Sequence, residues 1–229
     1  MVYGEVGQLS LQTKVDQRMI NYWLRLIMKD ETTIAYQFYK LSMQLFSNDV
    51  FQSSWLRRIK TILDSCGLTY VWQNQDYLDV KIVKLIVAKR LEDIAIQKWY
   101  TSISVSPMCE VYKEVKLDFG FEQYLLIHEC KYRIQITKCR CRNTKLPIKT
   151  CTYNDTTNIC TLCDMNCIGD EYHYLFVCPN VKYERELYIK KYYYKHPSMG
   201  KMKQLMCSVS NKELKNLAKF CTVISKRFK

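Results

Sequence analysis

Four cysteine and histidine residues in the C-terminal half of the chain have the spacing of a metal site. Two residues separate Cys160 from Cys163, nine separate Cys163 from His173, and four separate His173 from Cys178. Two thiolates on a tight turn, with a histidine and a cysteine about one helical turn apart, can converge on one tetrahedral Zn²⁺ ion. Because four protein ligands leave no coordination position open, we predict a single structural zinc ion rather than a hydrolytic centre.

The residues around this CCHC site fit it but leave alternatives open. Gly169 can turn the chain back, and Asp170 can cap a short helix. Cys167 could replace Cys163 as a ligand, although the C-x2-C spacing favours Cys163, and Cys151 is a further candidate. All of these could instead be ordinary buried cysteines, since the chain contains 12. If zinc binds, its apparent contribution of about 10 to 16 kcal/mol would organise a segment with little core of its own.

A second group of candidate residues is the stretch from 131 to 149, which contains seven cationic side chains and no acidic one. Lys138, Arg142 and Lys145 follow the spacing of one helical face, and a stripe of this kind can follow the phosphates of a nucleic acid. A solvated helix face is the alternative. The predicted phosphate contacts are Lys131, Arg133, Lys138, Arg140, Arg142, Lys145 and Lys149. Tyrosines next to lysines could add base stacking, unless they belong to the core: Tyr132, Tyr192, Tyr193 and Tyr194.

The charge of the whole chain favours the same kind of partner. With 35 Lys and Arg against 22 Asp and Glu, the net charge is +13, and residues 101–229 hold 22 of the basic and 12 of the acidic side chains. Such a field favours phosphate backbones or anionic surfaces. The most apolar stretch, residues 80–88, is interrupted by Lys81 and Lys84, and residues 1–15 lack the pattern of a secretory signal. We therefore expect no membrane association, reduced cysteines, and a location in the nucleus or the cytoplasm.

Patterns of catalysis are absent from the sequence. It contains no glycine-rich phosphate loop, no G-x-S-x-G motif and no adjacent pair of aspartates that could hold two metal ions. His128 and His196 have no nucleophile or carboxylate close by in the sequence. We therefore expect a protein that is not an enzyme and has no small-molecule substrate.

The elements that must position these groups are expected to be helices. Only 6 Gly and 4 Pro occur, and apolar residues recur at helical spacing through most of the chain, which predicts an all-α fold with a small CCHC finger. The small polar stretch before Pro107 suggests a division into regions 1–106 and 107–229. The expected helices begin behind Thr13 or Asp16, after Thr32 or Thr33, near Gln52 and at Lys81, and later ones cover about 110–117, 124–140 and 212–229. Their apolar stripes are expected to be core, for example Ile34, Phe38, Leu41 and Leu45 in the second helix.

The cysteine-rich segment CTLCDMNCIGDEYHYLFVCPNVKYERELYI resembles the zinc-binding C-terminal region of non-LTR (LINE-type) retrotransposon reverse transcriptases. The segment RIQITKCRCRNTKLPI resembles the basic segment before that finger, and MVYGEVGQLSL with MINYWLRLI resembles the stretch after the polymerase core. The resemblance implies a helical tail that binds RNA and target DNA during target-primed reverse transcription. It implies the same four zinc ligands, and phosphate contacts from Arg133, Lys138, Arg140, Arg142 and Lys145.

The polymerase and endonuclease portions of that family have no counterpart in the chain, so it is not expected to polymerise or cut nucleic acid. We therefore predict a stand-alone, zinc-stabilised module that binds RNA or single-stranded DNA and could join a reverse-transcriptase core in trans. A protein-interaction module, or a decayed fragment with no selected function, is the alternative.

Overall fold

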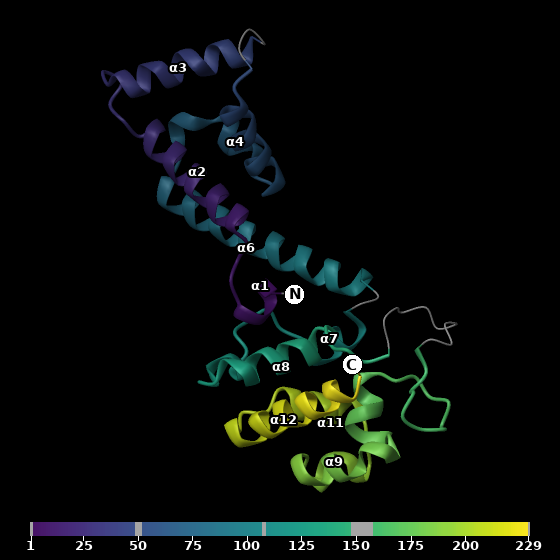
Figure 1. The fold of residues 1–229 in the computed structure, drawn as a ribbon. Coiled ribbons are helices and arrows are strands. Elements are labelled where there is room, and N and C mark those ends of the chain that lie inside the picture. The colour runs from purple at the N-terminus through teal and green to yellow at the C-terminus, as the bar shows by residue number, and fades with distance from the viewer. Residues whose placement is uncertain (1, 49–51, 107–108, 148–157, 229) are drawn as a thin grey trace. The chain divides into compact units, whose positions relative to one another are not determined.

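The computed structural model describes residues 2–48, 52–106, 109–147 and 158–228. Within these ranges the chain is helical and forms no strand, and its extended pairing is limited to two isolated bridges, Val6 with Phe121 and Ile159 with Ile168. This confirms the predicted all-α class. The chain divides into two compact units, Leu9–Lys98 and Met1–Gln8 together with Trp99–Lys229 (Figure 1). No helix in the described ranges is long and apolar enough to cross a membrane.

The unit Leu9–Lys98 is built from capped, amphipathic helices. The hydroxyl groups of Ser10, Thr33 and Ser53 each accept a hydrogen bond from the backbone N–H three residues later, which satisfies one free donor at the start of a helix. The helices are α2 (Leu11–Ile27), α3 (Ile34–Ser47), α4 (Ser54–Ser65), α5 (Thr69–Gln73), η1 (Gln75–Tyr77) and most of α6 (Val80–Val105). The cap of α2 is therefore Ser10, and not Thr13 or Asp16 as predicted. Asp16 is buried and binds Arg58 through both carboxylate oxygens, at 3.2 and 2.6 Å.

The core of this unit is apolar and has one hydrogen-bonded chain inside it. The indole Nε1 of Trp23 donates to the Tyr39 hydroxyl at 2.8 Å, and that hydroxyl donates to Gln75 Oε1 at 2.7 Å. Burial raises the pKa of Tyr39 to about 12, so its hydroxyl stays neutral. The surrounding buried side chains are Ile20, Leu24, Leu56, Ile59, Leu63, Val71, Val83 and Val87.

One predicted core stripe lies on the surface instead. Ile34, Phe38 and Leu41 of α3 are 84%, 71% and 53% exposed, and the buried residue of this helix is Tyr39. The reason is the hydrogen-bonded chain of Trp23, Tyr39 and Gln75, which turns the tyrosine face of α3 inward. The expectation that this stripe is core was therefore wrong.

The second unit combines both ends of the chain. The last turns of α6 belong to it, because Trp99 and Ile103 pack with Cys109 and Tyr112. Gly4 lies so close to Trp99 that a Cβ atom there would be 2.4 Å from the indole nitrogen. The division at residues 98 and 99 thus differs from the predicted boundary at 106 and 107, and α6 crosses this division and ends at Val105.

Most elements of this unit are short, and α12 is its longest complete helix with 17 residues. The elements are α1 (Val2–Val6), α7 (Glu110–Val115), η3 (Gln123–Leu126), α8 (Cys130–Arg140), η5 (His173–Val177), η6 (Pro179–Val181), α9 (Lys182–Tyr188), α10 (Lys191–Lys195), α11 (Met199–Met206) and α12 (Asn211–Arg227). Helix α12 packs against α8, and Figure 1 shows the two side by side. Its buried side chains are Leu214, Leu217, Ala218, Phe220, Cys221 and Ile224.

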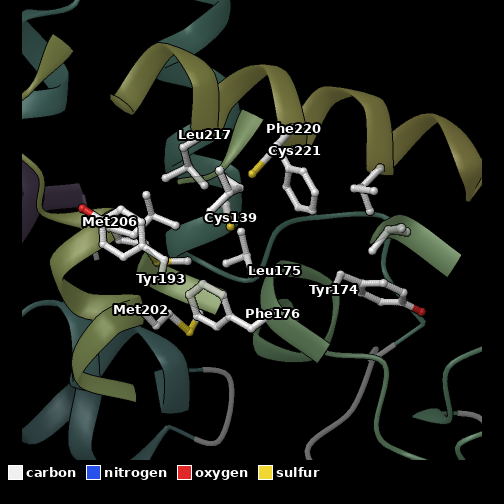
Figure 2. Packing of buried hydrophobic residues seen from close by; sticks show 14 of the residues in the cluster. Cys139, Tyr174, Leu175, Phe176, Tyr193, Met202, Met206, Leu217, Phe220 and Cys221 are labelled. Atoms are coloured by element: carbon white, nitrogen blue, oxygen red, sulfur yellow. The ribbon is translucent and has the colours of Figure 1, made fainter. Parts of the chain in front are cut away.

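The largest apolar cluster of this unit links the candidate metal site to the helices around it. Figure 2 shows Leu175 and Phe176 among side chains from other elements, with Tyr174 to one side. The residues that face them are Cys139 of α8, Tyr193 of α10, Met202 and Met206 of α11, and Leu217, Phe220 and Cys221 of α12. Residues 174–176 lie in the sequence between two candidate ligands, His173 and Cys178. Their side chains therefore anchor this part of the site in the core.

Candidate metal centre

The first half of the site is a hairpin-like turn over residues 158–169. The backbone N–H of Cys160 donates to the carbonyl of Cys167 at 2.9 Å, and that of Gly169 donates to the carbonyl of Asn158 at 2.8 Å. A Cβ atom at Gly169 would lie 2.8 Å from the Tyr174 hydroxyl and 3.1 Å from Cys160 Cα. A side chain at residue 169 would therefore have to displace the Tyr174 hydroxyl or the backbone of Cys160, which favours glycine where this turn closes against the following helix.

The second half is a short helical segment whose last turn is wider than an α-helix. Asp170 caps it as predicted, since its Oδ1 accepts a hydrogen bond from the His173 N–H at 2.8 Å. The N–H of Cys178 then donates to the carbonyl of His173 at 2.8 Å, which is the i to i+5 bond of a π-helix. The interval of five residues from His173 to Cys178 is longer than an α-helical turn of about 3.6 residues. The π turn instead returns Cys178 to the side of His173, so that both can face one ion.

These two halves bring four potential ligand atoms together. Cys160 Sγ lies 3.9 Å from Cys178 Sγ, Cys163 Sγ lies 3.4 Å from His173 Nε2, and all four atoms are within 4.8 Å of one another. Tetrahedral zinc with Zn–S bonds of about 2.3 Å and Zn–N bonds of about 2.05 Å separates two sulfurs by about 3.8 Å and a sulfur from a nitrogen by about 3.6 Å. The group could therefore hold a metal ion, and its donors and spacings suit a tetrahedral one.

The structure also distinguishes between the ligand alternatives. Cys163 is a member of the four-residue group, whereas the Cys167 thiol points elsewhere, with its Sγ 3.3 Å from the carbonyl of Met165. Cys151 lies outside the described residues. Among the described residues, the group of Cys160, Cys163, His173 and Cys178 is the one cluster that could hold a metal ion.

The thiols of this site lie close together, so a positive charge is needed if they are all to be deprotonated at the same time. Burial alone would raise the pKa of the Cys160 thiol, but the Tyr174 hydroxyl and the backbone N–H groups of Leu162 and Cys163 outweigh it and lower that pKa. Burial raises the pKa of Cys178 to about 12 and lowers the pKa of His173, which keeps the imidazole neutral and able to act as a ligand. A bound dication would supply the positive charge that stabilises the thiolates.

A buried arginine that the sequence analysis missed holds the wide turn in place. Arg185 of α9 donates through Nε to the carbonyl of Leu175 at 2.8 Å and through one terminal nitrogen to that of Cys178 at 2.7 Å. These carbonyls are the groups that a π turn and its end leave without helical partners. No sequence signal distinguishes Arg185 from the other cations around it.

The predicted phosphate-binding stretch separates into exposed and buried residues. Lys131 and Lys138 of α8, and Lys145 beyond it, are exposed, and Lys149 lies outside the described residues. Arg133 is half-buried and donates to the carbonyl of Ile127 at 2.8 Å. Three of the seven predicted contacts are thus fully open to a ligand.

Two of the seven are structural, and their predicted role as phosphate contacts is corrected here. The side chain of Arg140 is fully buried, 3.2 Å from Glu5 Oε1 and 3.0 Å from Glu122 Oε2, and it also donates to the carbonyl of Met206 at 3.1 Å. Because a phosphate cannot reach it, Arg140 is a cation of the core.

Arg142 is also turned inward. Helix α8 ends at Arg140, and Arg142 has a left-handed backbone with φ of 51°. Its side chain is 6% exposed, with Nε 3.5 Å from Glu171. The predicted common face of Lys138, Arg142 and Lys145 therefore does not form, because the helix ends before two of its members.

The partners of Arg140 form a buried polar cluster that spacing alone could not reveal. The Tyr124 hydroxyl donates to Glu5 Oε2 at 2.6 Å, and Lys116 binds Glu122 at 2.5 Å and the carbonyl of Gly120 at 2.6 Å. Glu5 is 135 residues from Arg140 in the sequence. Such a distant pair leaves no local pattern in the chain.

The tyrosines proposed for base stacking also differ in exposure. Tyr193 is buried, Tyr132 and Tyr194 are half-buried, and Tyr192 is 58% exposed. Of these four, Tyr192 presents the largest open surface to a ligand.

Comparison of the chain with models of protein families, with characterised proteins and with solved structures finds no match. The relation to non-LTR reverse transcriptases therefore remains a prediction, and the function has to be argued from the site itself.

Proposed function

We propose that this chain is a zinc-stabilised module that binds RNA or single-stranded DNA, related to the C-terminal region of non-LTR reverse transcriptases and without catalytic activity of its own. The observation that carries the proposal is the convergence of Cys160, Cys163, His173 and Cys178 at distances that suit a tetrahedral ion. Three thiolates and an imidazole favour zinc over the harder dications, which prefer oxygen ligands.

In this proposal zinc organises the fold and does not take part in a reaction. It would connect the turn at 158–169 to the helical segment at 171–178, and that segment is joined to the core by Leu175 and Phe176. With four protein ligands no position remains for a substrate or a water molecule. The chain's own residues would then contribute surface charge, from Lys131, Lys138 and Lys145, to a nucleic-acid partner.

Two measurements test the proposal. Metal analysis of the purified protein should give one zinc per chain. Fluorescence anisotropy should show binding to single-stranded RNA that weakens steeply from low to physiological salt, because each neutralised phosphate releases counterions. Replacement of Lys138 and Lys145 by Gln should reduce the salt slope by about 1.4 units for a single strand. Absence of zinc, or absence of binding at low salt, would contradict the corresponding half of the proposal.

A second candidate function is a protein-interaction module, and the exposed stripe of α3 favours it. Ile34, Phe38 and Leu41 have the 4-3 spacing of a helix pairing seam, and Lys40 is the one charged residue of the helix. A second copy of the chain could pair with this face without bringing many like charges together. Sedimentation equilibrium of the wild type and of Phe38→Ser distinguishes the two functions, because a dimer that the substitution dissolves would support the interaction module.

A further inference from the structure

Like the stretch from 131 to 149, the stretch from residue 187 to residue 212 carries charge of one sign only. It contains six lysines and one histidine and no acidic residue. Lys190 pairs with Glu213, but among the described residues no salt bridge involves Lys191, Lys195, Lys201, Lys203 or Lys212. Helices α10 and α11 therefore present positive charge that the fold itself does not neutralise.

An exposed aromatic side chain lies within this charge and is held in place. The Lys201 ammonium donates to the carbonyl of Tyr192 at 2.8 Å and lies 4.8 Å from the centre of its ring. The Tyr192 hydroxyl also donates to Gln204 at 3.1 Å. Because these contacts fix the ring while 58% of the residue stays exposed, a ligand that stacks on it loses little additional side-chain freedom.

Helix α10, which carries Tyr192, also carries two exposed lysines. Lys191 and Lys195 are both exposed and lie one helical turn apart, about 6 Å along the axis. The next tyrosine along the chain is unavailable, since Tyr193 is buried and its hydroxyl contacts Glu213 at 3.2 Å. The surface thus combines one exposed aromatic ring with lysines of the same helix and with Lys201 of α11.

We propose that the surface formed by Lys191, Tyr192, Lys195 and Lys201, called here the α10–α11 surface, binds single-stranded nucleic acid. A base stacks on Tyr192, and the lysines contact neighbouring phosphates. This inference rests on the proposed function and assigns it a site that the stretch from 131 to 149 does not include. A duplex is disfavoured because its bases are stacked on one another and do not offer a free face.

An anionic membrane fits this surface less well than a single strand. Helices that lie on membranes insert a broad apolar face. Most apolar residues of α10 and α11 point into the core instead, with Tyr193, Met202, Leu205 and Met206 all buried. Met199, at 39% exposed, is a single apolar side chain and not a broad apolar face.

The test is anisotropy of the full-length, zinc-loaded chain with a fluorescein-labelled oligouridine of about 10 nucleotides, measured over a range of salt. Lys191→Gln with Lys195→Gln should lower the salt slope by about 1.4 units, for two phosphates on a single strand. The matched control is Lys81→Gln with Lys84→Gln, which removes the same charge from exposed lysines of α6 and should leave the slope nearly unchanged.

Tyr192→Ala tests the stacking separately from the charge. It should weaken binding about tenfold or more with the salt slope unchanged, whereas Tyr192→Phe, which keeps the ring, should bind like the wild type. Zinc content is measured for each variant, so that loss of the fold is not mistaken for loss of contact.

The outcomes separate the two proposals. If the wild type binds the oligouridine but both sets of variants behave like the Lys81 and Lys84 control, the α10–α11 surface is overturned and the proposed function stands. If the wild type does not bind the oligouridine at low salt, the α10–α11 surface falls together with the RNA-binding part of the proposed function, and the zinc site is judged by the metal analysis alone. In a third outcome Tyr192→Ala has no effect, and Lys191→Gln with Lys195→Gln weakens binding to duplex DNA or phosphatidylserine vesicles as much as binding to the oligouridine. The surface then attracts any polyanion, and the single-strand assignment is wrong.

Discussion

The two compact units of the chain reach a folded state in different ways. In Leu9–Lys98 the helices α2, α3 and α4 are 12 to 17 residues long, and Asp16 is the one charged residue among its buried polar groups in the described ranges. In the unit that includes Trp99–Lys229, helices of five to eight residues are common, and buried charged or metal-binding side chains are numerous: Glu5, Lys116, Arg140, Glu171, His173, Glu184 and Arg185.

The two units offset the entropy of folding with different interactions. Long amphipathic helices bury enough apolar surface to offset the entropy of folding. Short helices with buried charges need specific partners, since an unpaired buried charge costs several kcal/mol. The second unit should therefore depend on a few individual residues and on metal, and the first should not.

The largest expected effect comes from loss of the metal. Cys163→Ser removes one ligand, and we expect it to release zinc and unfold much of the unit Met1–Gln8 with Trp99–Lys229, because structural zinc contributes about 10 to 16 kcal/mol in zinc-finger peptides. Hydrogen exchange should show lost protection at residues 158–178 and unchanged protection in α2 and α4. The control is Cys167→Ser, which should keep its zinc. Retention of zinc by Cys163→Ser, with loss in Cys167→Ser, would reassign the ligand.

A smaller but still large effect is expected at Arg140. Arg140→Met leaves the buried Glu5 without its cation, while Glu122 keeps Lys116, so the free energy of unfolding of this unit should fall by about 3 to 5 kcal/mol in urea denaturation. The exposed neighbour Lys138→Met should change it by less than about 0.5 kcal/mol. Equal effects of the two substitutions would show that the buried cluster does not stabilise the unit.

The first unit should respond to a lost hydrogen bond in the same way with or without zinc. Tyr39→Phe removes the acceptor of the Trp23 indole N–H and should lower the free energy of unfolding by about 1 to 3 kcal/mol. Tyr70→Phe, at an exposed tyrosine of α5, is the matched control and should be nearly neutral. If chelation of zinc changed the effect of Tyr39→Phe, the two units would be energetically coupled and the comparison would fail.

The smallest effect concerns pH. The side chains of Lys190 and Ser208 hold the pKa of Glu213 below its usual value. A carboxylate with a lowered folded pKa stabilises the fold above its unfolded pKa of about 4.3, and this contribution is lost as the pH falls through the folded pKa. Glu213→Gln should therefore be slightly less stable than the wild type at pH 7, and the difference should vanish once the pH has fallen below the folded pKa of Glu213. A difference independent of pH would mean that packing and not charge is responsible.

The spacing of residues in the sequence predicted the features that depend on interactions between segments close together in the chain. The 3.6-residue period identified the helices, and the C-x2-C pair with His173 and Cys178 identified the four residues that the fold brings together. The first of these depends on neighbours in the chain, and the second on a turn and a helix that are adjacent in sequence.

The features that the spacing did not predict depend on contacts between residues that are far apart in the sequence. The inward face of α3 is selected by Trp23 and Gln75, and Arg140 is buried because Glu5 and Glu122 neutralise it. A basic residue that is paired inside the protein looks the same in the sequence as one that binds phosphate. The wide turn at His173 was missed for a related reason, since Arg185 stabilises its carbonyls from another helix.

The position of Glu5 and Gly4 in the second unit bears on the order in which the chain is made. The residues between Gln8 and Trp99 form a complete unit inserted into another one, so the ribosome releases the first segment of the second unit about 90 residues before the rest of it. Leu9–Lys98 can fold as soon as it emerges, while Glu5 stays without its arginine until residue 140 has been synthesised. During that interval the Glu5 carboxylate has to stay in water, because the arginine that pairs with it in the core has not yet been made.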